Sequence, residues 1–596
     1  MLAVAFLGLT AATVWALARS PDTAADSCEG ASDKLAMLWN AQRQSSLETS
    51  LRDTGRAYAD EVWPRVSAGL DRYRDDWVSM HTAACLAHRR GEQSGELLDR
   101  RMACLARRRS AFSGAVQVLG EIRADNLARA IDVVEGLPSI DYCGNVEALT
   151  AEVAPPEDAV LAGQVRGLRE RLALVQNREN VGDYQEALAG VSAVVDEAEE
   201  LAYRPLLAEA LLVQGRVVMK MDRREDSVDS LYRAFLVGLE TGMDRTALEA
   251  LARYIYAEGT RSDSSVATMP FVHVGEAIAV RVPESAFGHA LLLNNAGAVQ
   301  LAREDRANAL DLFERAWRME RLVRDGNDKL ELTSILINLS IVAPHEELND
   351  SLRPALERLD RTLGAAHPTT LGLRMIHSYS IASPAEAVRI RASVCDAYER
   401  FHADLLYPRA ECLYSLGSLY AELGDTERAA EILASMHSLV PDDASPLIRH
   451  MARIAWATAL RYRQQLDRAI AAYRAVITEL RPLASAWWYE RILVDALLGL
   501  GRSLLTTGDH EQAAIYLDEA RASAERVASM NQSMDPRRRR AEAQIFLAMA
   551  LARGAQVERV EPLLEAAEAW YRSAGAGYRW RLQELETWRQ ERGQER

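Results

Sequence analysis

The stretch GSLYAELGDTERAAEILASM at residues 417–436 recurs in its spacing as GRSLLTTGDHEQAAIYLDEA at residues 501–520. In both stretches a Gly is followed after twelve residues by Ala, after four more by Leu, and after three more by another apolar residue. A Gly-Asp pair lies near the middle of each, and it is typical of a helix end followed by a helix start. Each stretch therefore predicts two antiparallel helices joined by a tight turn.

The same spacing recurs along the chain. The further matches are Gly215, Ser227, Leu231 and Ala234; Gly297, Ala309, Phe313 and Ala316; and Ala457, Ala469, Tyr473 and Val476. Two helices approach closely only where small side chains meet, and the large residue then fills the adjoining space. The pattern resembles the tetratricopeptide repeat. We therefore expect an all-α fold, a right-handed helical solenoid whose hairpins are stable only when they stack.

The repeats do not cover the whole chain. We expect a hydrophobic helix at 1–18, a linker at 19–30, a Cys-containing helical domain at 31–155, about ten repeats at 163–577 and a capping helix at 578–596. The repeat length of about 40 to 44 residues exceeds the minimal length of about 34, so each helix should gain about one turn.

The N-terminal segment predicts a transmembrane helix or signal anchor. Residues 2–18 carry no charge, and this length is at the lower edge of what spans a bilayer. No basic residue precedes the run as in a signal peptide, although Ala16-Leu17-Ala18 leaves a cleavage site open. The abrupt start suggests an anchor whose upstream part is missing. We expect a membrane-anchored chain whose bulk is extracytoplasmic, with a cytoplasmic location as the alternative.

Four cysteines lie in the predicted helical domain or just before it. Cys85 and Cys104 flank a turn near Gly91, so a helical hairpin would bring them face to face, and Cys28 and Cys143 bracket the same region. An oxidising compartment would allow these four residues to form disulfides. Buried free thiols that act as small hydrophobes are the alternative.

The segment around Cys85 carries a second resemblance. Residues 80–94 read MHTAACLAHRRGEQS, and residues 97–105 read LLDRRMACL. This region resembles the part that follows the membrane helix in myxobacterial-type serine/threonine protein kinases that end in tetratricopeptide repeats. The resemblance implies an extracytoplasmic sensory or scaffold module of a kinase signalling system. The chain itself has no Gly-x-Gly-x-x-Gly loop, His-Arg-Asp loop or Asp-Phe-Gly motif, so the kinase domain is absent from it.

Composition excludes several classes of function. The net charge of -16 argues against a nucleic-acid partner, because phosphate binding requires a basic surface. Nearly all basic residues are Arg, which we attribute to codon bias rather than to anion recognition. His345-Glu346-Glu347 lacks the second His of a metalloprotease helix, and no catalytic set stands out. We expect no enzymatic activity, no metal and no cofactor.

The candidate binding residues lie in the repeats. Asn295 precedes Gly297 by two positions, and Asn338 precedes Ser340 by two in the same register, with Asn294 adjacent. Both positions fall on first helices, which line the concave face in this fold, and similar repeats use such Asn amides to bind an extended peptide backbone. The alternative is an Asn bonded to water or to a neighbouring helix. The basic run at 537–540 is interpreted as a solvated helix start rather than a partner or lipid contact.

These observations favour a module that binds a protein or peptide ligand in the concave groove. The alternative is a stand-alone scaffold or assembly protein in the periplasm or cytoplasm with no link to a kinase.

Overall fold

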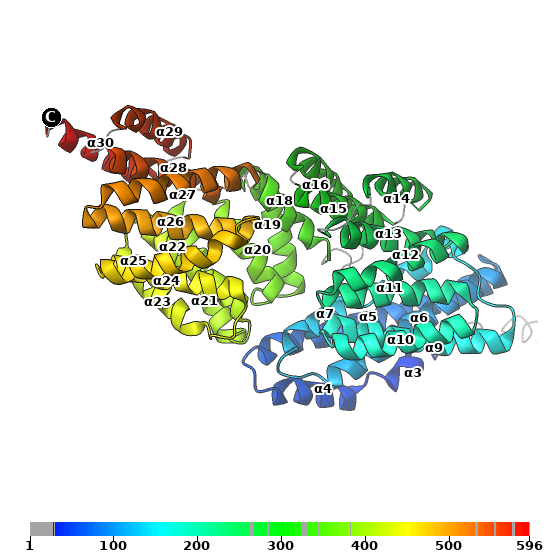
Figure 1. Ribbon diagram of the computed structural model, residues 1–596. Coiled ribbons are helices and arrows are strands. Elements are labelled where there is room, and N and C mark those ends of the chain that lie inside the picture. The colour runs from blue at the N-terminus through cyan, green and yellow to red at the C-terminus, as the bar shows by residue number, and fades with distance from the viewer. Residues whose placement is uncertain are drawn as a thin grey trace, which may run out of the picture. The chain divides into compact units, whose positions relative to one another are not determined.

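The computed structural model describes residues 28, 30–261, 267–282, 285–303, 305–323, 331–343, 345–381, 383–530, 534–552, 556–574 and 578–594. All regular secondary structure in these ranges is helical, which agrees with the all-α prediction (Figure 1). The chain divides into two units, one made of residues 1–292 and 322–330 and the other of 293–321 and 331–596. The division falls inside α15 (Ala286–Ala302).

The first unit opens with helices that do not follow the repeat. A buried Trp77 ties two of them together, because its indole Nε1 donates a hydrogen bond of 2.8 Å to the carbonyl of Leu105. The helices of this segment are α3 (Ala31–Ala36), α4 (Ala41–Asp53), α5 (Ala59–Arg89), α6 (Gly95–Gly120), η1 (Leu127–Arg129), α7 (Ala130–Glu135), η2 (Asp141–Gly144) and α8 (Val146–Ala151).

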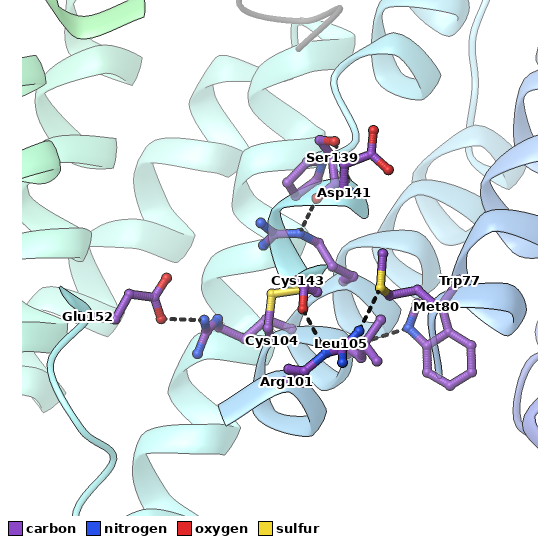
Figure 2. Close-up of a disulfide and its surroundings, with 12 residues drawn as sticks. Trp77, Met80, Arg101, Cys104, Leu105, Ser139, Asp141, Cys143 and Glu152 are labelled. Atoms are coloured by element: carbon purple, nitrogen blue, oxygen red, sulfur yellow. Dashed lines mark hydrogen bonds and ion pairs between the residues drawn. A yellow bond between two sulfur atoms is a disulfide. The ribbon is translucent and has the colours of Figure 1, made fainter. Parts of the chain in front are cut away.

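Two disulfides connect these helices, with a pairing that differs from the predicted Cys85–Cys104 contact. Cys28, which precedes α3, pairs with Cys85 in α5. Cys104 in α6 pairs with Cys143 in η2 (Figure 2). Cys85 lies four residues before the end of α5, whereas Cys104 lies nine residues after the start of α6. At 1.5 Å per residue their levels differ by about 7.5 Å, so a disulfide between them is not favoured. The guanidinium of Arg101 donates to the carbonyl of Cys143 at 3.3 Å and so fixes η2 beside α6.

Helical hairpins complete the first unit. Glu179 is fully buried between their helices, and its carboxylate pairs with Arg216 at 2.5 Å and with Lys220 at 3.0 Å. Burial alone would raise the pKa of Glu179, but these two cations outweigh it and lower that pKa to about 2. The helices are α9 (Ala159–Val181), α10 (Tyr184–Glu200), α11 (Arg204–Lys220), α12 (Arg224–Glu240), α13 (Asp244–Gly259) and α14 (Met269–Arg281).

The second unit continues with hairpins to the C-terminus, and consecutive helices contact one another. Its helices after α15 are α16 (Arg306–Glu320), α18 (Thr333–Val342), α19 (His345–Thr362), α20 (Pro368–Tyr379), α21 (Pro384–Phe401), α22 (Leu406–Glu422), α23 (Thr426–Leu439), α24 (Pro446–Tyr462), α25 (Leu466–Leu480), η3 (Arg481–Leu483), α26 (Trp487–Thr507), α27 (His510–Met530), α28 (Met534–Leu551), η4 (Val557–Arg559), α29 (Val560–Ser573) and α30 (Arg579–Gln594). A third disulfide, Cys395–Cys412, joins α21 to α22, and the sequence analysis did not predict it.

The Gly-Asp pairs form the predicted turns. Gly424 and Gly508 have φ values of 82° and 86°, a left-handed conformation that a residue with a Cβ rarely adopts. The side chain of Asp425 then accepts a hydrogen bond from the amide of Arg428 at 3.2 Å, which caps α23. Asp509 caps α27 in the same way.

In the structure, the small and large residues of the predicted repeat spacing contact each other across each helical hairpin. At each matching Gly, an added Cβ would lie well inside van der Waals distance of the large residue sixteen positions later. These distances are 2.5 Å for Gly215 and Leu231, 2.6 Å for Gly297 and Phe313, 2.8 Å for Gly417 and Leu433, and 2.4 Å for Gly501 and Leu517. The two helices of each hairpin therefore approach through the missing side chain of the Gly.

The predicted membrane-anchored, extracytoplasmic location is corrected by this structure. None of the helices in the described ranges combines the length and the apolar character needed to cross a bilayer. The longest helix, α5, contains many charged residues, which a span through the bilayer would have to bury. The segment 1–18, on which the prediction depended, lies outside the residues that the structure describes.

Candidate peptide-binding site

The three candidate asparagines come together between two first helices of the second unit. Asn294 and Asn295 lie on α15, and Asn338 lies on α18. The amide Nδ2 of Asn338 donates to the Oδ1 of Asn294 at 2.9 Å, and Asn294 donates to Asn295 at 3.4 Å. The structure therefore brings these three side chains into contact.

Their accessibility differs from the expectation. Asn294 is 4% exposed and Asn295 is 8% exposed, so neither amide faces open solvent. A buried amide must find partners inside the protein, and the Asn294–Asn338 hydrogen bond supplies one. This arrangement matches the alternative in which the asparagines connect neighbouring helices. A peptide-binding role for them stays a prediction.

A polar cavity lies elsewhere in the second unit, and sequence reasoning did not find it. Its volume is about 80 Å³, and most of its lining side chains come from the first helices of four consecutive hairpins, α22, α24, α26 and α28, and from the last described helix, α30. Each of these helices contributes charged or phenolic groups: Tyr414 and Glu422 on α22, Arg461 and Tyr462 on α24, Asp495 and Arg502 on α26, Arg538, Arg539 and Glu542 on α28, and Arg581 on α30.

Carboxylates and guanidiniums pair across this cavity. Glu542 accepts hydrogen bonds from Arg538 at 2.9 Å and from Arg581 at 2.8 Å. Arg538 also pairs with Glu422 at 2.9 Å, which connects α28 to α22. The ion pairs of Glu422 and Glu542 therefore connect α22, α28 and α30, which are distant in sequence.

Asp495 organises the second half of the network. It accepts a hydrogen bond from the hydroxyl of Tyr414 at 2.7 Å and from Arg539 Nη2 at 2.9 Å. The pKa of Tyr414 is raised well above its ordinary value, first by burial and then by the charge of Asp495. Tyr414 therefore remains a neutral hydrogen-bond donor.

The charge state of Glu542 follows from its neighbours. Burial would raise its pKa, but the guanidiniums of Arg538, Arg581 and Arg502 outweigh burial and lower the pKa to about 2. Glu542 is thus a carboxylate at neutral pH. Burial, together with repulsion from Arg461, lowers the pKa of Arg502 to about 10, which still leaves it charged.

Close helix approach shapes the wall of the cavity. An added Cβ at Gly499 would lie 2.2 Å from the ring of Tyr473, so this Gly leaves the space that the ring occupies. The hydroxyl of Tyr473 then shares a hydrogen bond of 2.7 Å with Thr458. Tyr473 is also the large residue of one repeat match, so the repeat spacing places it at the wall.

The interpretation of 537–540 as a solvated helix start is wrong for two of its residues. Arg538 and Arg539 are 8% and 4% exposed and project into the cavity from the first turns of α28. A run of arginines indicates charge but not burial, because burial is decided by α22 and α26 far away in the sequence. Among the described residues, no group of three His, Cys, Asp or Glu side chains could hold a metal ion.

Comparison with known proteins supports the repeat class. A tetratricopeptide repeat family model matches residues 411–443, which cover most of α22 and all of α23. No curated protein matches the chain. The match agrees with the predicted tetratricopeptide hairpins, but nothing found supports the resemblance to the C-terminal region of the myxobacterial-type kinases.

Two of the solved structures with similarity to the chain are the following. The TPR domain of P58(IPK) is 14% identical, with 68% of this chain and 99% of that chain covered and a TM-score of 0.18. The APC/C hetero-tetramer Cut9–Hcn1 is 13% identical, with 80% of this chain and 96% of that chain covered and a TM-score of 0.24. Similarity at such TM-scores carries no argument about fold or function.

Proposed function

We propose that this chain is a protein-interaction scaffold that binds a polypeptide partner through the first helices of its tetratricopeptide hairpins and does not catalyse a reaction. The observation that carries the proposal is the cavity of the second unit, because the first helices α22, α24, α26 and α28 of four successive hairpins, together with α30, present polar side chains to one space. Stacking of the repeats requires apolar contacts between helices, but it does not require that the helix faces around the cavity share a set of arginines and tyrosines. Such groups are frequent where proteins contact partners.

The test is a direct search for a peptide ligand. A random peptide library is displayed against the full-length chain, and enriched peptides are synthesised and titrated by fluorescence anisotropy. We expect saturable binding, with amide hydrogen exchange slowed in α24, α26 and α28 when a peptide is bound. A chain that yields no saturable peptide ligand, or one that is protected only outside the hairpins, would contradict the proposal.

A further inference from the structure

The cavity of the second unit contains more positive than negative charge. Five arginines line it, namely Arg461, Arg502, Arg538, Arg539 and Arg581, against the three carboxylates of Glu422, Asp495 and Glu542. The chain as a whole has a net charge of -16, so this local excess of two positive charges runs against the average composition. Concentrated charge in a partly buried space is unfavourable unless an opposite charge compensates it.

Glu584, beside the cavity, also pairs with Arg581 at 2.6 Å, so one positive charge of this excess remains, and it lies on the pair Arg461 and Arg502. The carboxylates of Glu422, Glu542 and Asp495 accept their hydrogen bonds and closest ion pairs from Arg538, Arg539 and Arg581. Arg502 lies 3.9 Å from the nearest oxygen of Glu542, beyond hydrogen-bonding distance. Arg461 makes no ion pair with any described carboxylate.

Arg461 illustrates this lack of a charged partner most clearly. Its Nε is buried without a hydrogen-bond partner, and the polar groups beside it are the hydroxyls of Tyr462 and Tyr473. Phenol groups are neutral at physiological pH and do not balance a guanidinium charge. Arg461 therefore has no charged partner, and Arg502 has only the 3.9 Å ion pair with Glu542, a carboxylate that it shares with Arg538 and Arg581.

Aromatic rings hold both guanidiniums in place. The Arg461 guanidinium lies 4.1 Å from the ring centroid of Tyr462, and the Arg502 guanidinium lies 4.4 Å from that of Phe546. Stacking on a ring restricts a guanidinium while leaving its N–H groups available, and this favours bidentate contact with an oxyanion. Repulsion between the two arginines contributes to the lowered pKa of Arg502, and a bound anion would relieve it.

The size of the cavity limits the ligand. A volume of about 80 Å³ compares with the roughly 10–15 Å³ that one ordered water needs, so it accommodates about five waters. This is enough for one small oxyanion and too little for a nucleoside or a folded domain. The ligand must therefore present a compact anionic group from outside the cavity.

We propose that Arg461 and Arg502 form a site for a phosphate monoester dianion, carried by a phosphorylated side chain of the polypeptide partner. The inference rests on the proposed scaffold function. A phosphoryl group supplies about -1.5 to -2 charge and three acceptor oxygens, which match two guanidinium forks and the neighbouring tyrosine hydroxyls. A carboxylate supplies only two oxygens and would leave more of the N–H and O–H donors of Arg461, Arg502 and the tyrosines without an acceptor.

The test compares three peptide pools on the full-length chain. Fluorescent random heptapeptides are centred on phosphoserine, on glutamate or on serine, and binding is measured by anisotropy. We expect the phosphoserine pool to bind about tenfold or more tightly than the other two. Inorganic phosphate and inorganic sulfate are titrated separately, with the melting temperature as the readout.

Three variants assign the effect to the two arginines. Arg461→Gln and Arg502→Gln should each weaken phosphoserine-pool binding about tenfold, and Arg502→Lys should retain part of it because charge remains while the fork is lost. Arg449→Gln is the matched control, since Arg449 lies exposed on the same helix as Arg461. Arg461→Gln removes no carboxylate contact and should leave the melting temperature unchanged, whereas Arg502→Gln removes one of the cations that lower the pKa of Glu542 and should lower the melting temperature slightly.

The outcomes separate the two proposals. Peptide binding that does not depend on phosphorylation or on Arg461 and Arg502 overturns this inference and leaves the scaffold function intact. Arginine-dependent stabilisation by inorganic phosphate, without peptide binding, contradicts both the scaffold function and the polypeptide source of the phosphate. A fall in melting temperature in both Gln variants, with peptide affinity unchanged, assigns the arginines to folding alone and overturns the site.

Discussion

The contact between Gly501 and Leu517 predicts different effects for two Gly→Ala substitutions in the same unit. Alanine favours a helix over Gly by about 1 kcal/mol, so Gly372→Ala should stabilise α20 by about that amount, because no atom lies within 4 Å of its added Cβ. At Gly501 the added Cβ lies 2.4 Å from Leu517, which is fully buried, and such overpacking costs about 1–3 kcal/mol. Gly501→Ala should therefore be less stable than Gly372→Ala by about 1–3 kcal/mol.

A double-mutant cycle isolates the contact. Leu517→Ala alone removes a buried side chain and should cost about 2–5 kcal/mol. In the double variant the new methyl at position 501 enters the space that Leu517 has left, so the pair should be less destabilised than the sum of the single changes by about 1–3 kcal/mol. The free energies are measured from amide hydrogen exchange in α26 and α27 and from urea unfolding of the full-length chain.

Two outcomes would contradict the explanation that Gly501 permits a close approach of α26 and α27. If Gly501→Ala stabilises α26 as Gly372→Ala stabilises α20, close helix approach is not what the Gly provides. Additivity within about 0.5 kcal/mol would show that Gly501 and Leu517 do not constrain each other. In either case the repeat spacing would lose its physical explanation.

Three further predictions concern buried polar groups and a disulfide. Glu542 and Glu179 have pKa values lowered to about 2, so the stability that they contribute is present above an unfolded-state pKa of 4.5 and is lost as pH falls toward 2. The free energy of unfolding should decrease by about 3 kcal/mol per group in that window. Gln at either position should flatten the pH dependence of the free energy of unfolding. Asn338→Ala should cost about 1–3 kcal/mol in urea unfolding, because a buried amide on α15 loses its donor, and an unchanged unfolding midpoint would favour the peptide-binding prediction instead. Replacing Cys395 and Cys412 by Ala should lower the free energy of unfolding by about 3 kcal/mol, the loop-closure value for a separation of 17 residues. Addition of a reductant should then have no further effect on amide hydrogen exchange in α21 and α22.

The hairpins could be predicted because their determinants are local. The distance from Gly417 to Leu433 is sixteen residues, a spacing that one hairpin contains completely. Both the turn at Gly424 and the cap at Asp425 depend on residues within that same span. A periodic pattern therefore carries enough information to place the helices and the contact between them.

The disulfide pairing could not be obtained in the same way. The hairpin of α5 and α6 was predicted, but the levels of Cys85 and Cys104 depend on where each helix ends, and helix ends are the least certain feature of a sequence pattern. Cys143 reaches α6 through η2, an irregular segment with no periodic signal. The asparagines were placed correctly on neighbouring first helices, but their burial depends on the packing around α15 and α18.

The cavity could not be predicted from the sequence, because its lining residues come from helices that are far apart along the chain. Tyr414 and Arg581 lie 167 positions apart, yet both line one space, because the helices α22, α24, α26, α28 and α30 all turn a face toward it. The repeat fixes which helix positions face that side but leaves their chemistry open, since only the small and large residues of the crossing are constrained. At Gly499 the same contact serves both helix packing and the cavity. The missing side chain of Gly499 leaves room for Tyr473, a residue of the repeat spacing, and so places a phenol at the cavity wall beside Arg461. A scaffold of this kind can therefore change its ligand by exchanging exposed groups on first helices, while the contacts that hold the helices together stay the same.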